Sequence, residues 1–90
     1  MSIDDLRRQI DAIDEQLVEL LSARATYALA IGRGKKAAGL EIYQPLREAE
    51  VLEHVRRVNP GPLDDDAVKR LFERVIDEAR RLERQADAEP

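Results

Sequence analysis

The sequence has no cysteine, no tryptophan and only 3% aromatic residues. Without cysteine, a disulfide framework and a thiolate metal site are both excluded. No apolar run approaches the roughly 20 residues that a membrane-spanning helix needs. The first five residues, Met1-Ser2-Ile3-Asp4-Asp5, have neither the basic nor the apolar region of a secretory signal. We therefore expect a cytoplasmic protein.

Cationic residues are not in excess, because the sequence has 15 lysines and arginines and 19 aspartates and glutamates, which give a net charge of −4. A nucleic-acid binder, or a protein of acidic membrane surfaces, is expected to carry a surplus of basic residues. We therefore expect neither nucleic acid nor a membrane as a partner. If the protein binds a small anion, a local cluster of cations must overcome the mildly negative charge of the whole chain.

What the sequence does have is apolar residues at helical spacing. Between residues 3 and 38 these positions follow a heptad register, which predicts one long helix. The stripe consists of Leu6, Ile10, Ile13, Leu17, Leu20, Tyr27 and Ile31. A helix of about 35 residues extends about 50 Å at 1.5 Å per residue. A small chain cannot cover that length by itself, so the stripe predicts pairing with a second copy.

Two shorter helices follow, and strand patterns are absent. One is predicted for residues 45–58, with Pro45 in its first turn. The Asn-Pro-Gly-Pro run at 59–62 breaks the chain, and the aspartates at 64–66 favour the start of a helix over residues 64–85. Residues 86–90 are expected to form a frayed tail. The sequence thus predicts a single all-α domain of three helices over residues 1–90.

Two cations lie on the apolar stripe of the first helix. Arg24 occupies the heptad position of Ile10 and Ile31, and an unpaired buried guanidinium costs several kcal/mol. Lys35 lies about three turns further on, near the same face and roughly 16 Å away along the axis. Together the two side chains can grip a small dicarboxylate. The alternative is that both reach solvent or pair with carboxylates of a neighbouring helix.

Arg7 flanks the same stripe four heptads before Lys35, about 42 Å away on a straight helix. The two cannot serve one site within one chain. If two first helices pair antiparallel, Arg7 of the partner subunit approaches the region of Arg24 and Lys35. The expected homodimer then has two identical sites, each completed across the interface.

On the second predicted helix, Gln44 and Glu48 are one turn apart and share a face, and Arg47 is adjacent to Glu48. His54, on the same helix, has no histidine, cysteine or acidic residue at metal-ligand spacing. We expect a surface role for His54 and no metal site.

On the third predicted helix, Glu83 continues the stripe of Ile76 and Ala79. It is therefore a second ionisable group on an otherwise apolar face. The alternative is an exposed residue of the last turn that pairs with Arg80 or Arg84.

Other motifs carry less weight. Gly32-Arg33-Gly34-Lys35-Lys36 looks like a phosphate loop, but no strand precedes it and the helical pattern runs through it. No Ser-His-Asp or Cys-His nucleophile set is present. Arg80, Arg81 and Arg84 alternate with acidic residues, which predicts a solvated, salt-bridged face.

The order and spacing of these residues resemble the small all-helical chorismate mutases, a class also found fused to prephenate dehydratase or dehydrogenase. The resemblance covers nearly the whole chain. It rests on Leu6, Arg7, Ile10, Ile13, Asp14, Leu17, Leu20, Leu21, Arg24, Ile31, Gly32, Lys35, Pro45, Leu46, Arg47, Glu48, Leu71, Phe72 and Ile76. It implies an intertwined dimer of three-helix chains.

The resemblance also implies a reaction, the conversion of chorismate to prephenate by a (3,3) rearrangement within one molecule, on the aromatic amino-acid pathway. Neither a nucleophile nor a cofactor is needed, because the enzyme holds the folded dianion and stabilises charge on its ether oxygen. Arg24 and Arg7 of the partner subunit would bind the two carboxylates. Lys35 would bind a carboxylate and the ether oxygen.

The same resemblance assigns the remaining site residues. Glu48 would hold the ring hydroxyl with help from Gln44, and Arg47 would support the carboxylate side. The apolar walls would be Ile31, Val51 and Ile76.

Three positions depart from the best-known bacterial pattern. Gln44 replaces an acidic residue, and Ala79 replaces a hydroxyl residue that contacts a carboxylate. Glu83 replaces a glutamine that donates to the ether oxygen, although fungal members of the family also carry glutamate here. Since a carboxylate can accept but not donate, Glu83 must be protonated for that role. We therefore expect activity to be stronger at mildly acidic pH.

Three other interpretations remain open. An isochorismate pyruvate lyase uses the same scaffold with a similar arginine and lysine arrangement, but resembles this chain less at Arg47-Glu48. A mutase domain can also depend on a larger pathway enzyme for its activity, as some short family members do. A helical dimerisation module with solvated charges would be no enzyme at all.

Overall fold

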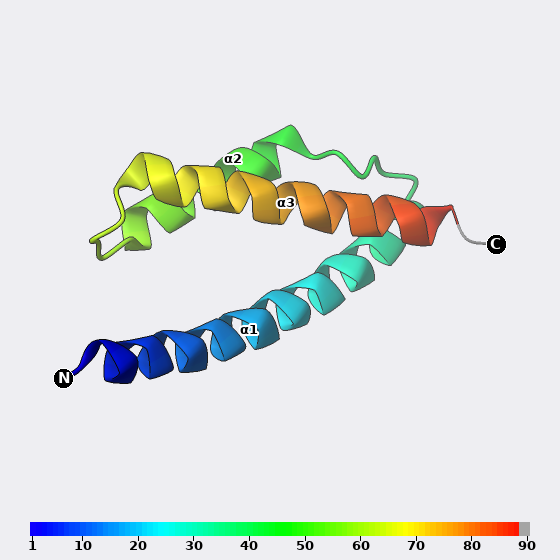
Figure 1. Ribbon diagram of the computed structural model, residues 1–90. Helices are drawn as coiled ribbons and strands as arrows, with labels where there is room; N and C mark the ends of the chain where they lie inside the picture. The colour runs from blue at the N-terminus through cyan, green and yellow to red at the C-terminus, as the bar shows by residue number, and fades with distance from the viewer. Residues whose placement is uncertain (89–90) are drawn as a thin grey trace.

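The computed structural model describes residues 1–88, and this part of the chain forms three α-helices and no strand (Figure 1). The helices are α1 (Ile3–Ala37), α2 (Pro45–Val58) and α3 (Asp65–Asp87). The predicted all-α class is confirmed, and the helices begin and end close to the expected residues. The helix α3 runs past residue 85, so Ala86 is helical rather than part of a tail. Residues 89 and 90 of that expected tail lie outside the described residues.

Local interactions set the two ends of α1. Ser2 Oγ accepts from the Asp5 N–H, and Asp5 Oδ2 accepts from the Ser2 N–H, both at 3.1 Å. This capping box satisfies backbone donors that a helix start leaves open. Hydrogen bonds from the Ser2 backbone and hydroxyl, and then from Arg8, lower the pKa of Asp5 below its ordinary value. At the other end, Gly39 takes a positive φ of 71°, which directs the chain away from the helix axis.

The helix α3 is the central element, because it packs against both α1 and α2. Figure 1 shows α3 beside α2, whereas α1 meets α3 toward its own C-terminal end and diverges from it toward its N-terminus. The described chain measures 54 × 27 × 14 Å, so it has little depth for a core. Only Val55, Ile76 and Glu83 are buried within the described residues.

The apolar stripe of α1 is largely uncovered in the single chain. Leu6, Ile10, Ile13 and Leu17 are each 47–55% exposed. A contiguous row of exposed apolar side chains is typical of an association surface. The pairing with a second copy stays a prediction. None of the helices in residues 1–88 combines the length and the apolarity that a membrane crossing requires.

Candidate active site

A cavity of about 280 Å³ lies where α1 meets α3 and the start of α2. It is lined by every predicted site residue except Arg7. These are Arg24, Ile31 and Lys35 of α1, Gln44 at the start of α2, Arg47, Glu48 and Val51 of α2, and Ile76, Ala79 and Glu83 of α3. The lining residues run from Arg24 to Glu83 in the sequence. The three helices thus bring residues up to 59 positions apart to one cavity.

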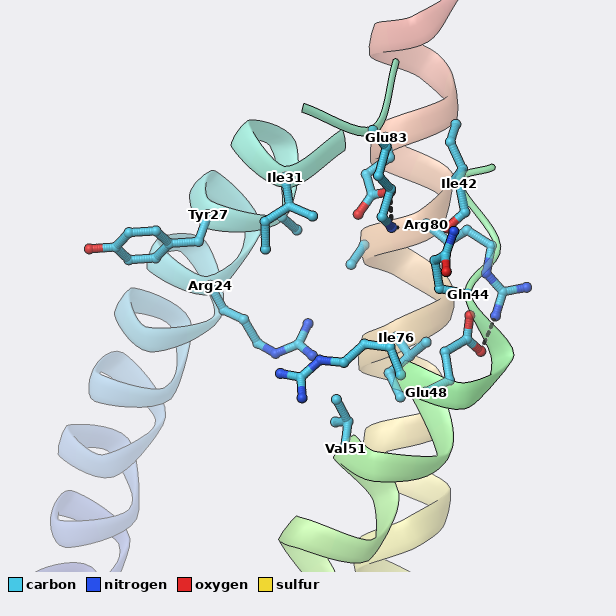
Figure 2. Close-up of a pocket in the computed structure, with 14 residues that line it drawn as sticks. Arg24, Tyr27, Ile31, Ile42, Gln44, Glu48, Val51, Ile76, Arg80 and Glu83 are labelled. Atoms are coloured by element: carbon cyan, nitrogen blue, oxygen red, sulfur yellow. Dashed lines mark hydrogen bonds and ion pairs between the residues drawn. The ribbon is translucent and has the colours of Figure 1, made fainter. Parts of the chain in front are cut away.

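Arg24 reaches from α1 across the cavity toward α2 and α3 (Figure 2). Its side chain is partly buried, and none of the ion pairs within residues 1–88 uses it. Arg47 also lines the cavity, but its side chain is 71% exposed and its Nη1 lies 3.2 Å from Glu50 Oε2. Arg24 is therefore a guanidinium in the cavity without a protein counter-ion in the described chain, as expected of a group that binds an anion.

Lys35 and Glu83 form an ion pair between α1 and α3. Lys35 Nζ lies 3.4 Å from Glu83 Oε2 and donates to the Ile42 carbonyl at 3.0 Å. The two side chains are 17% and 8% exposed. The alternative that Glu83 is an exposed residue paired with Arg80 or Arg84 is therefore wrong, because its partner is Lys35. For Lys35, the alternative of pairing with a carboxylate of a neighbouring helix is confirmed, whereas the alternative of reaching bulk solvent is wrong.

Gly32 allows this pair to sit close to α1. A Cβ at Gly32 would lie 3.0 Å from Glu83 Cγ, a separation that real side chains do not tolerate without a shift. A Cβ at Gly34 would meet nothing within 4 Å. The absence of a side chain at residue 32 therefore lets α3 place Glu83 directly against α1.

Glu48 forms a second, partly buried ion pair of the site, with Arg80. Arg80 Nη2 donates to Glu48 Oε1 at 2.6 Å, and both side chains are only about a quarter exposed (23% and 24%). The prediction that Arg80 belongs to a solvated face is wrong. Arg80 follows Ile76 by four residues, which places it on the edge of the stripe that contains Ala79. That spacing was the signal that could have found it.

Three more cavity residues were not predicted. Ala28 lies one turn after Arg24, so helical spacing could have identified it. Ile42 lies in the connection between α1 and α2, where no period applies. Tyr27 lines the cavity, but its ring is 74% exposed and Figure 2 shows it pointing away from the other site residues.

Arg7 lies outside the cavity of its own chain. Its side chain is 73% exposed and its nearest ion-pair partner is Asp4, at 3.8 Å on the same helix. Arg7 precedes Arg24 by 17 residues, about 25 Å along a straight helix. Only a second chain can bring an Arg7 side chain to this cavity.

The arrangement suits the binding and orientation of a small anion. Cations line the cavity, carboxylates and an amide are placed among them, and aliphatic side chains form the walls. Within residues 1–88 no cluster of three or more histidine, cysteine or acidic residues is placed to hold a metal. The groups present can bind carboxylates and hydroxyls by charge-assisted hydrogen bonds.

Comparison with known proteins places this geometry in a family. The family model for chorismate mutase type II matches residues 6–84. A bifunctional chorismate mutase/prephenate dehydratase of Neisseria gonorrhoeae is 41% identical over 87 residues, which cover 92% of this chain. The chain spans only 24% of the length of that curated relative.

Solved structures agree with the sequence match. Form II of the Thermus thermophilus chorismate mutase superimposes with a TM-score of 0.89 at 34% identity, over 91% of this chain and 93% of that one. The Helicobacter pylori chorismate mutase, solved in complex with prephenate, gives a TM-score of 0.89 at 30% identity, over 98% and 96% of the two chains. Sequence and fold agree along nearly the whole length, and the chain therefore belongs to the chorismate mutase type II family.

Proposed function

We propose that this chain is a chorismate mutase, an isomerase that converts chorismate to prephenate in aromatic amino-acid biosynthesis. The observation that carries the proposal is the cavity in which Arg24, Lys35 and Glu48 meet, supplying two cations and a hydroxyl acceptor at one place. The related Helicobacter pylori enzyme was solved with prephenate, the product of this reaction. A cytoplasmic location and action as one domain over residues 1–90 are part of the proposal.

The chemistry requires no nucleophile, because one bond forms and one breaks within the same molecule. The protein accelerates it by holding the substrate in the folded conformation and by stabilising charge on the ether oxygen. Arg24 binds one carboxylate, and the aliphatic side chains of Ile31, Val51 and Ile76 enclose the ring. Lys35 Nζ, already directed into the cavity by the Ile42 carbonyl, binds a carboxylate and the ether oxygen.

The ring hydroxyl is bound at the opposite side of the cavity. Glu48 accepts from it, Gln44 assists as donor and acceptor, and Arg47 supports the carboxylate side. Ala79 offers no hydroxyl, so the second carboxylate relies on guanidinium groups alone at that point.

Glu83 takes part in the same step when it carries a proton. Ionised, it accepts from Lys35; protonated, it donates to the ether oxygen, which an ionised carboxylate cannot do. Only the protonated carboxyl supplies this donor.

The site is completed by a second copy. Two α1 helices pair antiparallel through the exposed stripe that contains Leu6, Ile10, Ile13 and Leu17. Arg7 of the partner subunit then reaches the cavity and binds a substrate carboxylate. The stripe is apolar and about half exposed in the single chain, which supports this intertwined homodimer.

A larger pathway enzyme is a further proposed partner. The Neisseria gonorrhoeae relative joins a mutase to a prephenate dehydratase, an enzyme named for the mutase product. Measuring turnover with and without a prephenate dehydratase tests this partner, and an unchanged rate would rule out activation by it.

The proposal is tested by following chorismate loss and prephenate appearance with purified protein. Arg24→Ala and Lys35→Ala are the controls, and each is expected to lower kcat/KM by roughly 100-fold, the effect of losing a charged hydrogen bond worth about 3 kcal/mol. Assays with isochorismate, read by pyruvate release, distinguish the lyase. Folded wild-type protein that leaves both substrates unchanged would contradict the enzymatic function.

A further inference from the structure

Arg80 links three parts of the molecule beside the cavity. Its Nη2 donates to Glu48 Oε1 of α2 at 2.6 Å and lies 3.5 Å from Asp77 Oδ1 on α3. Its guanidinium carbon lies 4.9 Å from the centroid of the Tyr43 ring, in the connection that precedes α2. A guanidinium over an aromatic face is attracted by the negative charge of that face. Arg80 is thus held by an ion pair to α2 and by a ring from the connection.

Glu48 needs a partner of this kind. Its carboxylate is partly desolvated, so it requires a cation nearby. Of the other cations in the cavity, Lys35 already pairs with Glu83 and Arg47 with Glu50. An ion pair with Arg24 would neutralise the one guanidinium that these pairs leave for a substrate carboxylate within the described residues. Figure 2 shows Arg80 meeting Glu48 on the side away from Arg24. Arg80 therefore balances the charge of Glu48 without consuming a cation of the anion site.

The geometry also leaves Glu48 free to act. The hydrogen bond from Arg80 uses Oε1, so that Oε2 can accept a second hydrogen bond. Arg80 itself has a buried Nε that finds no hydrogen-bond partner within residues 1–88. A buried unsatisfied donor lowers stability, so a role beyond stability is expected of the residue that carries it.

We propose that Arg80 is a positioning residue that orients the Glu48 carboxylate toward the ring hydroxyl of the substrate. The inference rests on the proposed mutase function and adds a residue to it. Because Arg80 acts through Glu48, its removal is expected to affect catalysis only while Glu48 is a carboxylate.

The first experiment compares wild type with Arg80→Gln, Arg80→Lys and the control Arg74→Gln. Arg74 pairs with Glu78 on the exposed face of the same helix, so its variant removes an equal charge away from the cavity. We expect kcat/KM for chorismate to fall roughly 10- to 100-fold in Arg80→Gln, as for loss of one charged hydrogen bond. Arg80→Lys regains part of the loss, and Arg74→Gln is unchanged. Circular dichroism and melting curves establish that each variant is folded.

The second experiment is a double-mutant cycle with Glu48→Gln. If Arg80 acts through Glu48, the double variant Arg80→Gln/Glu48→Gln is no slower than Glu48→Gln alone. The positioning role would be overturned if the losses in kcat/KM of the two single variants multiply in the double variant. It would also be overturned if Arg80→Gln melts at a lower temperature while its kcat/KM is unchanged. Either result would leave the mutase function intact. An inactive wild type would overturn both. If Arg80→Gln does not fold, the cycle is built on Arg80→Lys, whose loss must likewise vanish in the Glu48→Gln background.

Discussion

The two halves of α1 differ sharply although they form one continuous helix. From Arg24 to Ala37 the helix meets α3 and lines the cavity, whereas from Leu6 to Leu17 its apolar side chains remain about half exposed. The packed half carries Lys35, paired across to Glu83, and the open half carries Arg7, paired only with its neighbour Asp4. One half therefore lines the cavity, and the other carries the exposed apolar surface that the proposed second chain would cover.

In the proposed homodimer, this difference couples association to activity. A rigid helix transmits the position of one half to the other, so the partner that covers the open stripe also sets where Arg7 of the partner subunit lies. The largest effects are expected from changes that prevent dimer formation or remove a guanidinium from the site, and the smallest from changes at the two glycines of the packed half.

A charge on the apolar stripe of the open half is expected to disrupt the proposed dimer interface. Ile13→Glu puts a carboxylate where two α1 helices are expected to meet, and burying an unpaired charge costs several kcal/mol. We expect loss of the dimer, measured by analytical ultracentrifugation, and loss of at least roughly 100-fold in kcat/KM, because the guanidinium of Arg7 is withdrawn from each site. Ser22→Glu, an equal charge on an exposed position about 180° around the helix, is the control. A dimeric and fully active Ile13→Glu would contradict the proposed interface.

The two halves can be tested in trans by mixing variants. Arg7→Ala and Arg24→Ala are each expected to lose roughly 100-fold in kcat/KM, since each removes one guanidinium from every site. In a mixed dimer, Arg24 of the first variant meets Arg7 of the second, so one of the two sites is intact and the other lacks both groups. Random mixing makes about half of the dimers mixed, so about a quarter of wild-type activity returns.

The result of mixing separates shared sites from sites within one chain. Variants that are unfolded and refolded together should regain activity, and each variant refolded alone is the control. If mixing restores nothing although the heterodimer forms, Arg7 does not serve the site of its partner.

The sequence predicted more of the fold than of the contacts within the site. The heptad register of the first helix, the Pro45 start and the aspartates at 64–66 were local signals, and the three helices follow them. Ten of the cavity residues were predicted: helical spacing singled out the polar and charged ones that break a helical face, and the family resemblance assigned the apolar walls and the roles. The pairing of Lys35 with Glu83 was not predictable, because it depends on how α1 crosses α3 and on the open space at Gly32.

Arg80 shows the limit of reading charge from sequence. Alternation of arginines with acidic residues predicted a solvated face, but α2 and the connection cover that edge of α3 and turn Arg80 inward. Periodicity assigns a face to each residue of a helix, but it does not say which faces a neighbouring element covers.

A smaller effect is expected at Glu83 of α3, which pairs with Lys35 in the packed half of α1. Glu83→Gln supplies an N–H donor to the ether oxygen at every pH, whereas the carboxyl donates only while it is protonated. We expect the preference for mildly acidic pH to flatten, measured as kcat/KM against pH, with the difference from wild type growing as the pH rises. Glu78→Gln, at an exposed position five residues earlier on the same helix, is the control. A pH profile that is the same in wild type and Glu83→Gln would count against the donor role.

The smallest effect is expected from two glycines in the packed half. Alanine is favoured over glycine inside a helix by about 1 kcal/mol. Gly34→Ala should therefore raise the melting temperature and leave kcat/KM unchanged, because its Cβ meets open space. Gly32→Ala receives the same helix stabilisation, but its Cβ would lie 3.0 Å from Glu83 Cγ and must displace that side chain by a few tenths of an ångström.

Gly32→Ala is thus expected to lower kcat by severalfold, since a shift of about 1 Å in a catalytic group can cost roughly 100-fold. Its melting temperature should rise less than that of Gly34→Ala. The pair separates helix stability from the placement of Glu83, because the two substitutions are chemically identical and lie within one turn of each other. Equal activity in both variants would show that Glu83 Cγ yields without moving its carboxyl, and that the close approach at residue 32 serves packing alone.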